Sequence, residues 1–136
     1  MYNCKLPPEQ SLGLLFNDFD DISSKDIVVV ALYPVKVMTS IYMVYGPFSP
    51  LSERLEFIYQ MLDASFFVLP IIAFNGAAIR VCDGRHRTSA MCLRSEAVIP
   101  FLTAKEMAPV IYRDLGTTHS TSMFDFSEIG YPLYKG

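Results

Sequence analysis

The sequence predicts a mixed α+β domain in which a small mixed sheet is flanked by helices. Three observations predict this class. The uncharged run from Ile27 to Leu32 is rich in β-branched residues, as in a strand buried on both faces. The pair Asn75-Gly76 separates two apolar runs and indicates a hairpin. Residues 51–62 place apolar side chains at helical spacing, and 136 residues suffice for one domain.

The first half of the chain alternates between helical and extended patterns. Residues 8–19 have the spacing of a short amphipathic helix that Pro8 can open. Residues 27–32 follow as the buried strand, and residues 37–45 also look extended. Residues 46–50 form a loop rich in proline and glycine.

The helix predicted after this loop has a capping residue and an apolar stripe. Ser49 can cap it, and Pro50 suits its first turn. Leu51, Leu55, Ile58 and Leu62 then fall on one face, which we expect to be buried.

The next segment is the predicted hairpin. Residues 70–74 form its first strand and residues 77–82 its second. Asn75 and Gly76 both tolerate the positive φ angles that a tight hairpin turn requires. Asp83-Gly84 then ends the second strand.

The remainder of the chain predicts a short helix, a strand and a further helix. The short helix covers residues 87–94 and the strand residues 98–102. Thr103 to Glu106 match a capping box, which predicts a helix that runs to about Asp114 and ends at Leu115-Gly116. The tail, residues 119–136, is too apolar to remain free, so we expect it to pack on the domain or on a partner.

Composition excludes several classes of protein. Half of the residues are hydrophobic and 18% are charged, which argues against disorder. No apolar run has the roughly 18 residues of a membrane span, and the N-terminus lacks the pattern of a secretory signal. The three cysteines, Cys4, Cys82 and Cys92, lack metal-binding spacing and suit a reducing cytoplasm.

Charge is distributed unevenly along the chain. The net charge of −3 makes broad binding to duplex DNA an unfavoured function. Asp18, Asp20 and Asp21 form an acidic cluster near the start. Four of the eleven basic side chains fall between positions 80 and 94, where Asp83 is the only acid. This basic segment therefore directs attention to one local site.

The turn from Asp83 to Arg87 carries the chemistry that predicts an anion site. Gly84 permits a sharp turn and close approach of another group. A helix that begins here presents free N–H groups and the positive end of its dipole, both of which attract phosphate. Arg85, His86 and Arg87 add cationic groups, and arginine can grip a phosphate with two hydrogen bonds.

Three neighbours complete the predicted site. Thr88 and Ser89 add hydroxyl donors. Asp83 can cap the helix, orient an arginine, or bind a magnesium ion carried by a nucleotide. The same residues can also form an ordinary solvated loop with a capping residue, and His86 can be a structural hydrogen-bonding group; composition alone leaves these alternatives open.

The segment from Leu69 to Leu102 resembles the core of the ParB/sulfiredoxin superfamily. That core has a proline and an apolar strand, a hairpin, and then Gly-x-His/Arg-Arg opening a helix with an alanine one turn in. Here the motif is Gly84 to Arg87, with Ala90 in the helix and Ile99-Pro100 in the following strand. The resemblance covers about residues 27–118 and implies one ParB/sulfiredoxin-like domain over 1–136, with 119–136 as a packed tail.

The resemblance also implies a ligand. Family members bind ATP, CTP or ADP, so Gly84, His86 and Arg87 correspond to phosphate contacts. Arg54 lies on the preceding helix, where sulfiredoxins have a lysine that reaches the nucleotide. Residues 115–118 are similar to a Leu-Gly-x-Ser stretch late in sulfiredoxins. The implied cofactor is a nucleoside triphosphate or diphosphate with Mg²⁺.

Two departures from the family narrow the expected function. Arg85 occupies the position of the sulfiredoxin cysteine, so repair of sulfinic acids is not expected. The chain ends too early for the helix-turn-helix domain of ParB proteins, so binding to a partition site is not expected either. The pattern is typical of stand-alone cores in plasmid- and phage-borne proteins. Some of these resemble fertility-inhibition factors and have relatives with nucleotidase or nuclease behaviour.

Three functions follow from these residues. In the first, His86 and Arg87 hold the phosphates of a nucleotide, Arg85 offsets developing charge, and Asp83 binds Mg²⁺ or positions the attacking group. Spacing cannot choose a general base from Glu53, Glu56 and Asp63. This candidate is a phosphohydrolase or phosphotransferase.

The second function is a non-catalytic module that inhibits a partner protein and uses the nucleotide as a structural ligand. Surface tyrosines favour such an interface, and the alternative for each of them is partial burial in the core. The candidates are Tyr2, Tyr45, Tyr59, Tyr112, Tyr131 and Tyr134. The third function is a nuclease that holds a DNA phosphodiester at the same turn; the negative net charge counts against it.

Overall fold

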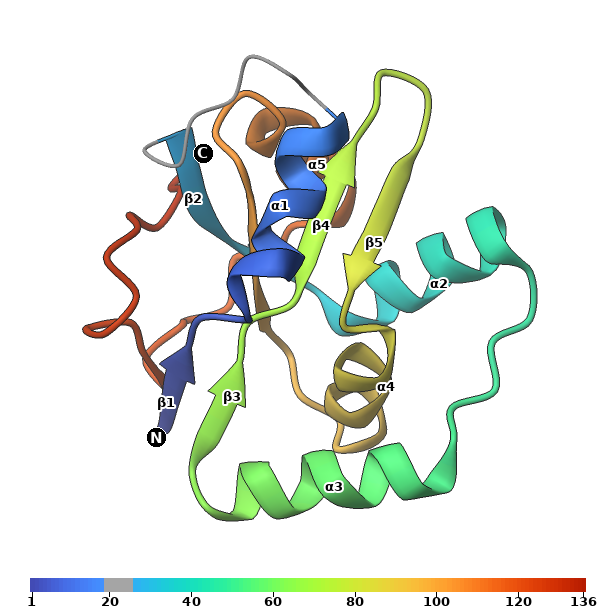
Figure 1. Cartoon of the computed structure of the whole chain (residues 1–136), viewed down its shortest axis with the longest axis vertical. Coiled ribbons are helices and arrows are strands. Elements are labelled where there is room, and N and C mark those ends of the chain that lie inside the picture. The colour runs from blue at the N-terminus through green and yellow to red at the C-terminus, as the bar shows by residue number, and fades with distance from the viewer. Residues whose placement is uncertain (19–25) are drawn as a thin grey trace.

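A computed structural model describes residues 1–18 and 26–136 and has two sheets with helices around them (Figure 1). The predicted α+β class is confirmed. The positions of Phe19, Asp20 and Asp21, which belong to the predicted first helix or the acidic cluster, lie outside the described residues.

The larger sheet has four strands in the order β2-β6-β4-β5. These are β2 (Ile27–Leu32), β6 (Ile99–Ala104), β4 (Ile71–Phe74) and β5 (Ile79–Asp83). β2 pairs antiparallel with β6, and β4 pairs antiparallel with β5, whereas β4 and β6 are parallel. Every residue of β2 and β6 is buried, which explains the unbroken apolar run of β2 and the largely apolar sequence of β6, where Thr103 is the one polar residue.

The smaller sheet joins distant parts of the chain and was not predicted. It has the order β3-β1-β7, with β1 (Tyr2–Lys5), β3 (Phe66–Val68) and β7 (Phe124–Asp125) all parallel. The C-terminal segment packs on the domain through the buried side chains of Phe124 and Ile129.

One predicted strand is wrong. Residues 37–45 belong to helix α2 (Pro34–Tyr45), not to an extended segment. Pro34 stands at the start of the helix, where its fixed φ is favourable. Val37 and Ile41, four residues apart, are buried on its inner face. Tertiary burial of this face outweighs the strand propensity of the β-branched residues.

The other helices lie close to their predicted positions. They are α1 (Glu9–Asp18), α3 (Ser52–Asp63), α4 (Arg85–Leu93) and α5 (Ala108–Leu115). None of the helices in the described residues has the length and apolar character needed to cross a bilayer.

The predicted helix starts need correction. The N-cap of α3 is Leu51, with no side-chain capping bond, so Ser49 does not cap it. Leu51 is also exposed, although it belonged to the predicted apolar stripe. The capping box at Thr103 to Glu106 is wrong because Thr103 lies in β6, where sheet pairing uses its backbone. α5 begins at Ala108 and ends at Leu115, as predicted for its C-terminus.

The β4–β5 hairpin is confirmed, but its turn differs from the predicted one. Asn75 does not have a positive φ; among these turn residues only Gly76 does, at 92°. The Asn75 side-chain oxygen instead accepts hydrogen bonds from the Ala77 and Ala78 amides, at 2.9 and 2.8 Å. The connection therefore spans four residues and is held by an asparagine side chain.

The arrangement of these elements creates one junction. β5 leads through Gly84 directly into α4, and α3 packs across α4 (Figure 1). α1 lies beside β4, so its start comes near the same place (Figure 1). Residues from the first, middle and later parts of the chain thus meet where β5 ends.

Candidate functional site

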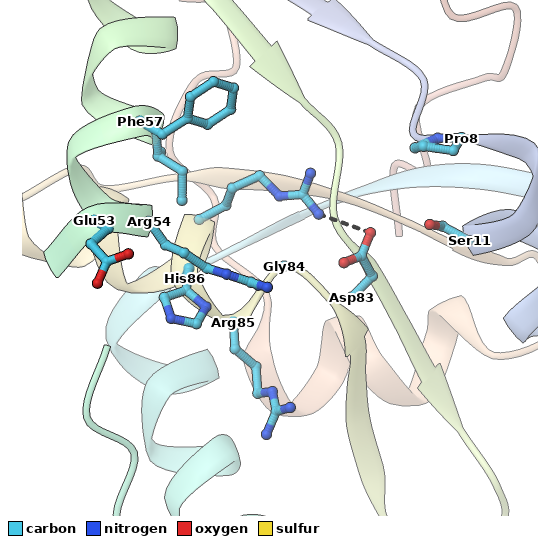
Figure 2. A pocket seen from close by; sticks show the side chains of 11 residues that line it. Pro8, Ser11, Glu53, Arg54, Phe57, Asp83, Gly84, Arg85 and His86 are labelled. Atoms are coloured by element: carbon cyan, nitrogen blue, oxygen red, sulfur yellow. Dashed lines mark ion pairs between the residues drawn. The ribbon is translucent and has the colours of Figure 1, made fainter. Parts of the chain in front are cut away.

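A pocket of about 500 Å³ lies at the junction of β5 and α4. Figure 2 shows residues of α3 on one side of it and Pro8 and Ser11 on the other. Its lining residues come from three parts of the chain and are Pro8, Ser11, Glu53, Arg54, Phe57, Ile58, Asp83, Gly84, Arg85, His86 and Arg87.

Gly84 is required at the entry to α4. Its φ is 104°, in the left-handed region that favours glycine. A Cβ at this position would overlap the Pro70 Cβ and lie 3.1 Å from Arg87 Nη2. α4 begins immediately afterwards, at Arg85, two residues earlier than predicted.

The first turn of α4 supplies backbone donors. The Thr88 amide donates to the Gly84 carbonyl at 2.9 Å, and this is the first bond of the helix. The amides of Arg85, His86 and Arg87 precede that bond, so helix geometry gives them no partner within α4. Gly84 provides no side-chain cap. The helix start therefore has unused donors and a positive dipole end beside the pocket.

Arg87 is held by Asp83. Arg87 Nη2 lies 2.9 Å from Asp83 Oδ2, and the arginine side chain is only 17% exposed (Figure 2). The ion pair fixes the direction of the guanidinium, whose five N–H groups exceed what one carboxylate oxygen can accept. Arg87 is thus a positioned cation with remaining donors.

Arg85 leaves the same turn in another direction. Its guanidinium carbon lies 4.6 Å from the Tyr45 ring centroid and 5.6 Å from that of Phe48. Figure 2 shows the Arg85 side chain directed away from Asp83, the partner of Arg87. The structure therefore does not bring the two guanidinium groups together, although both residues border the pocket.

His86 makes a structural hydrogen bond. Its Nε2 accepts from the Leu51 amide at 3.1 Å, and its ring meets Phe48 edge-on at 5.2 Å. Desolvation, and then the charges of Arg54 and Arg85, lower the pKa of His86 below its ordinary value of 6.5. A neutral ring whose Nε2 accepts carries its proton on Nδ1, so His86 offers one N–H donor and no full charge.

Two predicted phosphate donors do not line the pocket. Thr88 and Ser89 are both buried. The Thr88 hydroxyl donates to the Gly84 carbonyl at 2.9 Å, and the Ser89 hydroxyl contacts Met38 Sδ at 3.5 Å. Their positions inside α4 turn these hydroxyls toward the protein, which corrects the prediction that they face a ligand.

α3 brings Arg54 and Phe57 to the pocket. Figure 2 shows the Arg54 side chain extending toward Gly84. Phe57 lies one turn later on the same helix and is 63% exposed, a large fraction for an aromatic ring. Sequence reasoning missed Phe57, which its spacing of three residues from Arg54 could have indicated. It also missed Pro8, Ser11 and Ile58; Pro8 and Ser11 carry no local signal because only the tertiary fold brings them here.

The structure separates the three candidate general bases. Glu53 lines this pocket. Glu56 and Asp63 line a different depression along α3, and Asp63 pairs with Arg94 at 2.9 Å. Of these three carboxylates, only Glu53 therefore borders the predicted site.

The next observations concern the possible metal ligands and the buried thiol of Cys4. Within residues 1–18 and 26–136, no group of three or more His, Cys, Asp or Glu is placed to hold a metal ion. Asp83 is the predicted magnesium ligand, and its carboxylate is paired with Arg87. Burial raises the pKa of the Cys4 thiol to about 12, so this thiol is protonated at neutral pH.

Comparisons with protein-family models, with curated proteins and with solved structures found no match to this chain. The similarity of residues 69–102 to the ParB/sulfiredoxin core therefore stays a prediction from the motif.

Proposed function

We propose that the chain is a nucleotide-binding protein and that the pocket at the start of α4 holds the phosphates of an ATP- or CTP-type nucleotide. One observation carries the proposal. The open first turn of α4, Arg54, Arg87 and the exposed ring of Phe57 all border one pocket of about 500 Å³. That volume lies within the roughly 300–1,000 Å³ of small-molecule sites.

The phosphate end is defined by three kinds of donor. The amides at the start of α4 favour an anion through hydrogen bonds and the helix dipole. Arg87 is partly desolvated and already oriented by Asp83, so little side-chain entropy is lost when it binds. Arg54 extends toward the same glycine and adds a second guanidinium (Figure 2).

The base end is defined by Phe57. An exposed aromatic ring on a pocket wall is a stacking surface for a planar base. Such stacking contributes about 1–3 kcal/mol per base and tolerates any base identity. Because Phe57 follows Arg54 by one helical turn, one nucleotide can contact both side chains. This pairing favours a nucleotide over free phosphate.

Hydrolysis of the bound nucleotide is the second candidate function. The presence of Glu53 in the pocket wall favours it. Glu53 is a carboxylate of the pocket wall, and none of the ion pairs among the described residues includes it. In this reaction water attacks the terminal phosphorus, the bond to the leaving diphosphate oxygen breaks, and Glu53 accepts the proton of the water. Mg²⁺ enters with the nucleotide as part of the substrate. Release of phosphate that is lost in Glu53→Gln and kept in Glu56→Gln would support this reaction.

Thermal unfolding with ATP, CTP or ADP, each with Mg²⁺, tests the binding proposal. A ligand at 100 times its Kd stabilises the folded state by about 2.7 kcal/mol, or roughly 8 °C for a chain of this size. We expect one nucleotide to raise the melting temperature of the wild type and of Arg113→Ala. Arg113 is a suitable control because it forms an exposed ion pair on α5, away from the pocket.

The same experiment can refute the proposal. Arg87→Ala should keep its fold and lose about half or more of the nucleotide-dependent shift, as a 10- to 100-fold weaker affinity requires. If no nucleotide stabilises the wild type, nucleotide binding is wrong. Stabilisation by DNA alone, with a steep dependence on salt, would favour the nuclease hypothesis instead.

A further inference from the structure

The side chains at the phosphate end of the pocket carry no net formal charge. Arg54 and Arg87 are the cations of this end, and Glu53 and Asp83 are carboxylates of the same lining. Arg85 also borders the pocket, but its guanidinium lies over two aromatic rings on the other side of the turn. Among the described residues, the two cations are thus matched by two carboxylates. The positive potential that remains comes from the start of α4.

His86 does not add a cation to this end. Its Nε2 accepts a hydrogen bond from the Leu51 amide at 3.1 Å, and a ring nitrogen that accepts carries no proton. Desolvation, and then the charges of Arg54 and Arg85, lower the pKa of the ring below 6.5. The ring is therefore neutral at neutral pH. A ligand with several negative charges meets less positive charge here than the motif suggests.

Asp83 already occupies the cation that a phosphate would use. Its Oδ2 lies 2.9 Å from Arg87 Nη2 (Figure 2). The Asp83 side chain is 36% exposed and that of Arg87 17%, so the carboxylate is the more accessible member of the pair. A phosphate oxygen that binds Arg87 must therefore share the guanidinium with the carboxylate. Two anions brought this close together repel each other.

This repulsion increases with the charge of the ligand. A free nucleoside triphosphate carries more negative charge than its magnesium complex, because the bound ion neutralises part of that charge. A lining without net side-chain charge offsets the smaller charge better than the larger one. Selection between related ligands often depends on such a repulsive group as well as on attractive ones.

We propose that Asp83 determines the specificity of this site: it competes with the ligand phosphate for Arg87, and the pocket therefore selects the magnesium complex of a nucleotide over the free polyphosphate. The inference rests on the proposed function. Asp83 acts through Arg87 and through its charge, without contact to the magnesium ion of the substrate. Neutralising Asp83 should therefore strengthen the binding of a free nucleotide.

Isothermal titration calorimetry with ATP, in EDTA and with Mg²⁺, tests this role on the wild type and Asp83→Asn. The asparagine oxygen can still accept from Arg87, so the guanidinium stays oriented while the negative charge is lost. Asp83→Asn should bind free ATP about 10-fold more tightly than the wild type, and the magnesium complex less than about threefold more tightly. The preference for the magnesium complex should decrease accordingly.

Asp63→Asn is the matched control. Asp63 also pairs with an arginine, Arg94, at 2.9 Å, but it lines the other depression on α3. The substitution changes the net charge of the protein by the same amount, and both forms of ATP should bind as they do to the wild type. If Asp83→Asn does not fold, as judged by circular dichroism, Asp83→Ser removes the same charge and should give the same gain for free ATP.

The outcomes separate this inference from the proposed function. If the wild type binds the magnesium complex but Asp83→Asn gains no affinity for free ATP, the role of Asp83 is overturned and nucleotide binding stands. Loss of affinity for the magnesium complex in Asp83→Asn would also overturn it, by showing contact with the ion.

Inorganic pyrophosphate in EDTA tests the competition without a nucleotide. If the wild type binds no nucleotide, the proposed function is wrong. Tighter binding of pyrophosphate by Asp83→Asn than by the wild type would then still support competition for Arg87. Failure of both proteins to bind pyrophosphate, together with failure to bind nucleotide, would overturn the inference as well.

Discussion

The two sides of the first turn of α4 perform different tasks. On one side Arg87 is held by Asp83 at 2.9 Å and borders the pocket. On the other side Arg85 lies over the rings of Tyr45 and Phe48. The two arginines are two residues apart in sequence, and a helix rotates by about 200° over two residues. The two side chains therefore point to nearly opposite sides of the helix, although their residues are close in the sequence.

The aromatic side acts as a support for the pocket side. His86 accepts a hydrogen bond from the Leu51 amide, which is the capping residue of α3. α3 in turn carries Arg54 and Phe57, which line the pocket. In the proposed function Arg54 and Arg87 therefore bind the ligand, and His86 holds α3 in place.

Gly84→Ala should reduce the stability of the protein more than any other substitution considered. Gly84 directly precedes α4, so it positions both the pocket side and the aromatic side of the first turn. The left-handed φ and the overlap with Pro70 should together cost at least about 3 kcal/mol of unfolding free energy. Gly76→Ala is the control: its φ is also positive, at 92°, but nothing lies within 4 Å of the added Cβ. Urea unfolding should show a smaller loss there, of about 1 kcal/mol. Equal losses would show that the contact with Pro70 contributes nothing.

Replacing Arg87 and Arg85 with alanine, one at a time, should show which side of the turn binds the nucleotide. Arg87→Ala should weaken nucleotide binding by about 10- to 100-fold, since it removes charge-assisted hydrogen bonds. Arg85→Ala should change the affinity by less than about threefold, because its guanidinium contacts rings outside the phosphate end. Isothermal titration calorimetry measures the dissociation constant of each variant. A larger loss of affinity in Arg85→Ala than in Arg87→Ala would place the ligand on the aromatic side.

The pH dependence of stability should report the burial of His86 beside Arg54 and Arg85. The pKa of His86 is lowered in the folded state, so the unfolded state binds the proton more readily. The stabilisation is complete above the ordinary value of 6.5 and is lost as pH falls from 6.5 through the folded pKa. Urea unfolding at about pH 7.5 and about pH 5 should show a smaller change in His86→Asn than in the wild type. His119→Asn, at the other histidine, should behave like the wild type.

Arg85→Met should have the smallest effect. It keeps the apolar stem of the side chain over Tyr45 and removes the cation, so only about 0.5–1 kcal/mol of cation–π stabilisation should be lost. In a Tyr45→Leu background the same substitution should cost less, which a double-mutant cycle of unfolding free energies measures. An undiminished cost would show that the ring does not hold Arg85.

Local sequence patterns correctly predicted the uniformly buried strand β2 and the pairing of β4 with β5 in a hairpin. β2 has an unbroken apolar sequence because all six of its residues are buried, although it is an edge strand, and its outer edge is covered by the C-terminal segment at Pro132 and Tyr134. The β4–β5 pairing follows from the sequence around Asn75-Gly76. The parallel sheet of β1, β3 and β7 could not be predicted, because its strands are short and pair over long sequence distances. α2 was missed because its β-branched residues favour a strand until tertiary packing buries Val37 and Ile41.

The candidate site was also predictable only where it depends on local sequence. The turn from Asp83 to Arg87 is local, and the pocket includes all five of its residues. The directions of Arg85 and Arg87 depend on Tyr45, Phe48 and Asp83, so the motif alone could not give them. Thr88 and Ser89 were misassigned because a motif does not show which helix face is buried.

The most direct measurement is a titration of the ¹⁵N-labelled protein with ATP and Mg²⁺, followed by amide chemical shifts. Binding at the start of α4 predicts that the amides of Arg85, His86 and Arg87 shift together with one Kd, and that Arg87→Ala weakens this response. The proposal would be contradicted if these amides did not move, or if the shifts gathered along the face of α3 that carries Glu56 and Asp63.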